Sequence, residues 1–286
     1  MTASTPDSFE LHAGALRLAL RPDLGGVIAG LWHGETPVLR STEPAALAQP
    51  RTSASYPLVP YSNRIGYRRF AWMGKDYTTA PNFGDNPHSV HGVAWLRAWE
   101  VISSSQGEAA LRYRHAADEH WPFAFDVVQY FKLTPQELTV RFVFTNRDAI
   151  AQPVGLGWHP YFPKRAHSNL QIELTGRWDS DATQLPVRLV AQSGIDANVS
   201  ELDFDNCFEG WKGAARIRDE KFSLQLTSTL PYLVVYTPKD KDYFCVEPVS
   251  HVSNAIRMDD PAAHGLRPLA PGETFEASMT LAVTAL

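Results

Sequence analysis

Residues 138–145 read Leu-Thr-Val-Arg-Phe-Val-Phe-Thr, with a large apolar side chain at every second position from Leu138 to Phe144. Side chains on a β-strand point to opposite faces in turn, so this period of two predicts a strand with one face on a core. The same alternation recurs in residues 16–21, 170–175, 222–227 and 275–283. No segment shows a sustained helical period, and only residues 42–48 suggest one or two helical turns, with Pro44 near their start. The pattern is typical of an all-β protein.

Turn-forming residues separate these strands along the whole chain. The 21 prolines and 18 glycines are spread out, and no change in composition indicates a linker. We therefore predict a single domain over residues 1–286, a large antiparallel β-sandwich with few short helices.

Composition excludes several classes of partner. The net charge is −5 and the isoelectric point is near 6.1, which disfavours nucleic acid and anionic membranes. Only two cysteines, Cys207 and Cys245, are present, too few for a disulfide framework or a four-cysteine zinc site. The chain begins Met-Thr-Ala-Ser-Thr-Pro-Asp without a signal-peptide pattern, and no apolar run approaches the ~20 residues of a membrane span, so we expect a cytoplasmic protein.

Polar and ionisable residues gather beside aromatic ones in four clusters. The longest weakly patterned segment, residues 49–94, holds two of them, and loops of this length in a compact domain are usually functional. The clusters are Pro60-Tyr-Ser-Asn-Arg-Ile-Gly66, His88-Ser-Val-His-Gly92, Gly157-Trp-His-Pro-Tyr-Phe162 and Phe244-Cys-Val-Glu-Pro248. Glu247 follows an apolar run, which suggests partial burial at a strand end, and buried carboxylates are usually paired or functional.

Each candidate also has an ordinary structural interpretation. His88 and His91 are spaced like a metal pair, but no third ligand lies at a metal-like interval, so we expect no metal. Taken alone, His159 is better explained as a hydrogen-bonded structural histidine and Glu247 as the end of a strand or the partner of an arginine. The sequence contains no nucleotide-binding glycine motif and no Gly-x-Ser-x-Gly nucleophile motif, and we expect no cofactor.

Together, the order and separation of these clusters resemble the aldose 1-epimerase (mutarotase) family over nearly the whole chain. The resemblance is carried by Asn63-Arg-Ile-Gly66, Asn82, His91-Gly92, His159-Pro-Tyr-Phe162, Asp205-x-x-Phe208 and Cys245-x-Glu-Pro248. It implies the galactose-mutarotase-like sandwich and an isomerase of carbohydrate metabolism that interconverts the α and β anomers of a hexose.

The resemblance also implies a role for each residue. Glu247 would be the base that takes the O1 proton, and His159 the acid that protonates the ring oxygen, a role that His91 would share in a proportion left open. Arg64, Asn63, Asn82 and Asp205 would bind sugar hydroxyls, with the nearby Asp203 as the alternative to Asp205. One shared cleft would gather these residues, and the implied reaction needs neither metal nor redox chemistry.

Three questions stay open at this stage. A catalytically silent sugar-binding protein would not need Glu247 and His159 together, and a glycoside hydrolase is disfavoured because it needs two acidic groups. The expected partner is a small sugar, either neutral or charged at C6 by a phosphate or sulfonate. Basic residues that could bind such a charge are Arg51, Arg64, Arg68, Arg69 and Lys239. The chain is expected to be a monomer or a homodimer.

Overall fold

The computed structural model describes residues 7–286, and strands dominate it. Strand makes up 50% and helix 6% of the residues, with no helix of seven or more residues in the described part. None of the helices in residues 7–286 is long and apolar enough to cross a membrane. The prediction of an all-β fold is confirmed. Four of the five alternating segments lie in β2 (Leu16–Arg21), β13 (Glu137–Asn146), β23 (Phe222–Ser228) and β27 (Thr274–Ala285), whereas the segment predicted over residues 170–175 is a strand only as far as the end of β17 (Asn169–Ile172).

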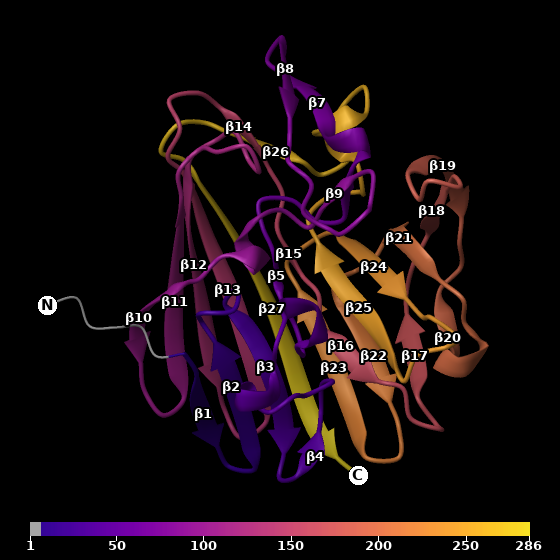
Figure 1. Ribbon diagram of the computed structural model, residues 1–286. Helices are drawn as coiled ribbons and strands as arrows, with labels where there is room; N and C mark the ends of the chain where they lie inside the picture. Colours follow the sequence, from indigo (N-terminus) through magenta and orange to yellow (C-terminus); the bar gives the residue numbers. More distant parts are fainter. Residues whose placement is uncertain (1–6) are drawn as a thin grey trace, which may run out of the picture.

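A nine-stranded antiparallel sheet forms one large layer of the molecule (Figure 1). In spatial order it contains β10 (Glu100–Ser104), β11 (Glu108–His115), β12 (Phe125–Leu133), β13, β27, β23, β22 (Ala214–Arg218), β17 and β20 (Ile195–Asn198). The C-terminal strand β27 lies in its middle, between β13 and β23, and pairs with both. Buried and exposed residues alternate along β13 and β27, so one face of this sheet supplies the core.

An eight-stranded sheet carries two of the four polar clusters that the sequence singles out, residues 157–162 and 244–248. Its strands in order are β19 (Pro186–Ala191), β18 (Gly176–Ser180), β21 (Asp205–Glu209), β24 (Tyr232–Tyr236), β25 (Tyr243–Val249), β15 (Gly157–Trp158) and β5 (Pro57–Leu58), with β16 (Tyr161–Pro163) also paired to β25. All of β25 after Tyr243 is buried, which explains why its sequence is nearly continuously apolar.

Smaller elements complete the fold. A four-stranded sheet joins β1 (Phe9–Ala13), β2, β3 (Val27–His33) and β4 (Thr36–Pro37), and three pairs join β6 (Arg64–Ile65) with β9 (Ser89–Val90), β7 (Arg69–Trp72) with β8 (Lys75–Thr78), and β14 (Gln152–Val154) with β26 (Arg267–Leu269). The 3-10 segments are η1 (Pro44–Ala46), η2 (Pro50–Thr52), η3 (Gly66–Arg68), η4 (Ala94–Leu96), η5 (Val199–Glu201) and η6 (Ala255–Arg257). The helical turns expected in residues 42–48 are the single turn η1, with Pro44 at its start.

Aromatic packing joins the two large sheets next to His159. Phe142 of β13 stacks on Trp158 of β15, with ring centres 4.5 Å apart and planes 3° from parallel. Both side chains are almost fully buried, and removing one aromatic ring from such a core typically costs about 3–5 kcal/mol. Because His159 follows Trp158 directly, this stack fixes the backbone that carries it.

Candidate active site

One open cavity of about 820 Å³ brings together the scattered residues that the sequence singles out. Its lining includes Arg64, His91, His159, Asp205 and Glu247. They come from β6, the turn after β9, the link between β15 and β16, the start of β21, and β25. About half of the lining comes from residues 49–91, so the long weakly patterned segment forms one wall.

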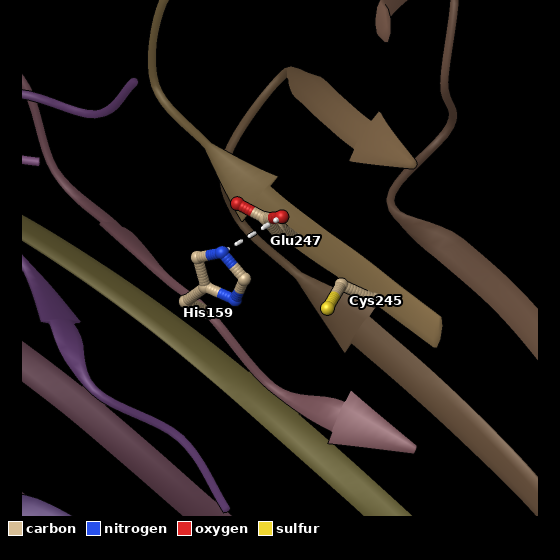
Figure 2. A group of neighbouring side chains, drawn as sticks. All are labelled: His159, Cys245 and Glu247. Atoms are coloured by element: carbon tan, nitrogen blue, oxygen red, sulfur yellow. Dashed lines mark ion pairs between the residues drawn. The ribbon is translucent and has the colours of Figure 1, made fainter. Parts of the chain in front are cut away.

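Glu247 and His159 form a buried pair at the floor of the cavity. The imidazole Nε2 of His159 lies 3.3 Å from Oε1 of Glu247, and the two side chains are 9% and 3% exposed. Figure 2 shows the imidazole facing the carboxylate across this contact, with Cys245 beside it from the same strand as Glu247. Cys245 and Glu247 are two positions apart on β25, and side chains at that spacing point to the same face of a strand.

Burial moves the two pKa values of this pair in opposite directions. Desolvation raises the pKa of Glu247 well above its usual value, with a further increase from Asp205 and an opposing decrease from Arg64. Desolvation, assisted by the positive charge of Arg40, lowers the pKa of His159 to about 3. The free site therefore favours a protonated carboxyl beside a neutral imidazole over a buried ion pair.

His91 is held as a neutral hydrogen-bond donor. Its Nδ1 accepts a 3.1 Å hydrogen bond from the backbone N–H of Asn63, so the ring proton belongs on Nε2. Desolvation and the nearby His159 lower the pKa of His91 well below its usual value. Its ring meets the edge of the His159 ring at 5.2 Å.

Arg64 connects the cavity wall to a neighbouring hairpin. Its Nη1 donates to Oδ1 of Asn63 at 2.7 Å, and its Nη2 donates to the side-chain oxygen of Gln184. The same Nη2 lies 3.8 Å from Asp205, which also accepts a 3.5 Å hydrogen bond from Gln184. Apart from the buried Asn63, these groups are at least partly exposed, and all four are bonded to one another and line the cavity.

The structure separates the two aspartates that the sequence leaves open. Asp205 lines this cavity, whereas Asp203 does not and instead pairs with Lys239 at 2.9 Å. Asp205 is thus the aspartate placed for contact with a ligand in the cavity.

Asn63 lines the cavity, but Asn82 does not. The amide nitrogen of Asn82 donates to the carbonyls of Val90 and Gly92 at 2.9 Å, and its oxygen accepts the N–H of Val90 at 2.8 Å. The side-chain amide of Asn82 is therefore bonded to the backbone on both sides of His91. Asn82 thus holds the histidine turn in shape, and the expected role of binding hydroxyls stays a prediction.

The turn at His91 depends on backbone conformations that ordinary residues avoid. His91 and Gly92 both have positive φ, 64° and 73°. A β-carbon at position 92 would lie 2.0 Å from the carbonyl oxygen of Val59, so glycine is required there. This turn aims the imidazole of His91 at the cavity.

Two groups of side chains in residues 7–286 deserve comparison with metal ligands, and the absence of a metal stays a prediction. His159, Cys245 and Glu247 offer donor atoms within 4.8 Å of one another. Without a metal, burial raises the pKa of the Cys245 thiol well above its usual value. His88 points elsewhere: its Nδ1 accepts the N–H of Tyr67 and its Nε2 contacts the carbonyl of Thr183 at 3.0 Å.

Several residues that line the cavity were not predicted from the sequence. Gln184 sits with φ 64° in the turn between β18 and β19, and no local pattern distinguishes it. The rings of Tyr56 and Tyr161 both pack against the imidazole of His159, with ring centres 4.6 and 4.5 Å from it and 6.2 Å from each other. Tyr161 belongs to the quoted His159 cluster, so the motif contained a signal for it, whereas Tyr56 had none.

Comparisons with known proteins agree on one family. Residues 7–282 match the model of the aldose 1-epimerase family. The uncharacterized protein YphB of Escherichia coli is 35% identical over 298 residues, covering 96% of this chain and 98% of that relative.

Solved structures give the same result. The crystal structure of a candidate aldose 1-epimerase from Escherichia coli K12 superposes with a TM-score of 0.89 at 32% identity, covering 98% of this chain and 99% of the other. A galactose mutarotase-like protein from Clostridium acetobutylicum has a TM-score of 0.86 at 19% identity, covering 98% and 95% of the two chains, and this likeness concerns the fold alone.

Proposed function

Because the chain belongs to the aldose 1-epimerase family, we propose that it interconverts the α and β anomers of an aldose by opening and reclosing the sugar ring. The observation that carries this proposal is the buried contact of 3.3 Å between Glu247 and His159 on the cavity floor. One acid and one base are what the reaction needs, and this pair supplies both side by side.

The reaction moves one proton at each of two oxygens. In ring opening, the carboxylate of Glu247 takes the proton from O1 while the imidazolium of His159 protonates the ring oxygen O5, and the C1–O5 bond breaks. The free aldehyde turns about the C1–C2 bond and closes from its other face, with each group returning its proton. Each of the two groups contributes ~10²–10⁴ in rate.

The pKa shifts of the pair fit this cycle. The ion pair that starts ring opening and the neutral pair that follows it hold the same single proton. Burial favours the neutral pair, which is the state able to close an open-chain aldehyde, while Arg64 lowers the pKa of Glu247 and so stabilises the ion pair. His91, with a proton on Nε2, donates a hydrogen bond to O5 or an adjacent hydroxyl.

Arg64 and Asp205 would hold hydroxyls, as would Asn63. We further propose that residues 1–286 act as one domain on a small sugar, without a metal or another cofactor. A cytoplasmic location and a monomeric or dimeric state stay predictions.

A second candidate substrate is an aldose with an anionic group. Arg51 lies over the ring of Phe83 at 4.8 Å, and both line the cavity. Within residues 7–286, no carboxylate forms an ion pair with Arg51. Phe83 in turn contacts His91 at 6.1 Å, so Arg51 lies on the side where a group next to O5 would project.

Exchange NMR at anomeric equilibrium tests the function and both substrate classes. The protein is added to neutral hexoses and to their 6-phosphates, and magnetisation transfer between the anomers is compared with the uncatalysed rate. Acceleration with any of these sugars supports the proposal. Sugars that bind without faster exchange would instead indicate a carbohydrate-binding protein, and preference for the 6-phosphates would favour the anionic class.

A further inference from the structure

Arg40 lies behind the cavity wall, at the end of a column of stacked rings. Its guanidinium carbon is 3.6 Å from the ring centre of Tyr161 and 4.7 Å from that of Tyr243. Tyr161 also stacks on the imidazole of His159, at 4.5 Å and 19°, and Tyr56 packs on that imidazole at 4.6 Å. We call the order Arg40–Tyr161–His159 the imidazole column, and Tyr56 packs beside it, with its ring centre 6.2 Å from that of Tyr161.

The guanidinium of Arg40 is fixed by neutral groups alone. Its Nη2 donates to the carbonyls of Ser53 and Arg51 at 2.6 and 2.7 Å, and its Nε donates to Ser53 at 3.2 Å. Its backbone N–H donates to the carbonyl of Tyr161 at 2.8 Å. Among the described residues, no carboxylate forms an ion pair with it. The column therefore ends in a half-buried positive charge that no neighbouring anion neutralises.

The imidazole of His159 depends on this column for its orientation. Its one polar contact is the 3.3 Å contact with Glu247, and its buried Nδ1 has no hydrogen-bond partner among the described residues. Packing against the rings of Tyr161 and Tyr56 therefore replaces the hydrogen bond that usually orients a catalytic histidine.

Few other ionisable groups face this imidazole. From β25 they are Glu247 and the thiol of Cys245, and from the turn after β9 it is His91. Burial raises the pKa values of the Tyr56 and Tyr161 phenols far above neutral pH, so both phenols stay neutral. Among the charges that bear on His159, Arg40 is the one that lowers its pKa, after the larger effect of burial.

We propose that Arg40 is a positioning residue for the epimerase reaction, acting through Tyr161 to hold the imidazole of His159 and to set the pH range in which the Glu247–His159 pair exchanges its proton. The inference rests on the proposed function. Arg40 does not line the cavity, so it acts without touching the sugar. Two roles are combined in one side chain, orientation by stacking and control of protonation by charge, and substitutions separate them.

The test compares Arg40→Gln, which keeps an amide donor but removes the charge, with Arg40→Lys, which keeps the charge but loses the planar stack. Anomeric exchange is measured against pH for both variants and the wild type. The two limbs of the profile report the macroscopic pKa values of the coupled pair. Removing this cation makes His159 bind its proton more tightly, so the acidic limb of Arg40→Gln, which follows His159, should move to higher pH.

Arg40→Lys should keep both limbs within about 0.3 unit of the wild type, since the charge remains, while its rate falls several-fold because the stack is weaker. Arg141 offers a matched control, because it also lies over a tyrosine ring, Tyr130 at 4.4 Å, and does not line the cavity. Arg141→Gln should leave the profile unchanged.

A purely structural role would lower the rates of Arg40→Gln and Arg40→Lys alike and leave the limbs in place, which overturns the inference. If Arg40→Gln does not fold, judged by its circular dichroism and melting, Arg40→Met serves as the second neutral variant. A wild-type protein that accelerates exchange of no sugar contradicts the proposed function itself, which is a different outcome from an accelerating enzyme whose limbs do not move.

Discussion

The floor and the rim of the cavity use the same kinds of side chain in opposite environments. On the floor, the carboxylate of Glu247 is 3% exposed and faces an imidazole with an unpartnered nitrogen. At the rim, the carboxylate of Asp205 is 38% exposed and shares Arg64 with Gln184. Burial on a central strand shifts the proton affinity of the floor carboxyl, whereas partial exposure at a strand end leaves the rim carboxylate open to contact with a ligand.

The largest expected effect separates these two carboxylates by the same chemical change. Glu247→Gln keeps the shape of the side chain but cannot accept a proton, so we expect kcat to fall by ~10²–10⁴ with sugar affinity nearly kept. Asp205→Asn at the rim should mainly raise KM. Anomeric exchange by saturation-transfer NMR measures both. A Glu247→Gln enzyme within about threefold of the wild type would place the base elsewhere.

A slightly smaller effect is expected for the other member of the pair. His159→Asn removes the acid, but His91 already holds a proton on Nε2 and lies next to it, so part of the proton donation should persist. We expect a loss in kcat of ~10²–10³. Combining His159→Asn with Glu247→Gln should cost much less than the product of the single losses, because acid and base act in one coupled step. Full multiplication of the two losses would show that the residues act independently.

Much of the fold, and the candidate residues on the floor, could be predicted from the sequence. Strands such as β13 and β27 can be predicted from the local alternation of apolar and polar residues. The His159 and Glu247 clusters are short continuous stretches of sequence. The rim is different, because Gln184 enters the site through a turn whose sequence has no special pattern.

Asn82 illustrates the second limit of the sequence. Its position near His91 suggests contact with a sugar, yet its amide bonds to the backbone of the turn. Nothing in the local sequence distinguishes an amide that faces a cavity from one that faces a carbonyl. The position of Arg40 against the ring of Tyr161 could not be predicted from the sequence either, because it depends on contacts between distant segments.

An intermediate effect is expected at the rim. Arg64→Ala removes a charged donor that would hold a hydroxyl throughout the reaction and also removes the cation that lowers the pKa of Glu247. We expect KM to rise and kcat to fall, each by ~10-fold, because charge-assisted hydrogen bonds contribute about 1.5–3 kcal/mol. Titration of the sugar against the protein by calorimetry separates binding from turnover. Unchanged sugar affinity with a large loss in kcat would mean that Arg64 acts on the proton transfer by Glu247 and His159 and not on sugar binding.

The smallest expected effect is on stability, and its sign follows from the pKa of Glu247. The folded protein holds this carboxyl's pKa above its ordinary value near 4.5, so the folded state keeps a proton that the unfolded chain releases. Stability from this group is therefore present below about pH 4.5 and is lost as the pH rises toward the folded pKa. Glu247→Gln has no such loss, so its advantage in melting temperature over the wild type should grow from acidic to neutral pH.

Each 1 kcal/mol of this difference corresponds to about 2–4 °C in a chain of this size. The decrease in stability that His159 causes in acid, as the pH falls from 6.5 toward its folded pKa of about 3, occurs in both proteins and largely cancels in the comparison. Glu35 is exposed and forms no ion pair within residues 7–286, so Glu35→Gln is the matched control and should show no such trend. Thermal melts from pH 4 to 8 measure the difference. A constant gap between Glu247→Gln and the wild type over this range would mean that burial does not shift the proton affinity of the carboxyl on the floor, and the contrast between the two regions would then lie in geometry alone.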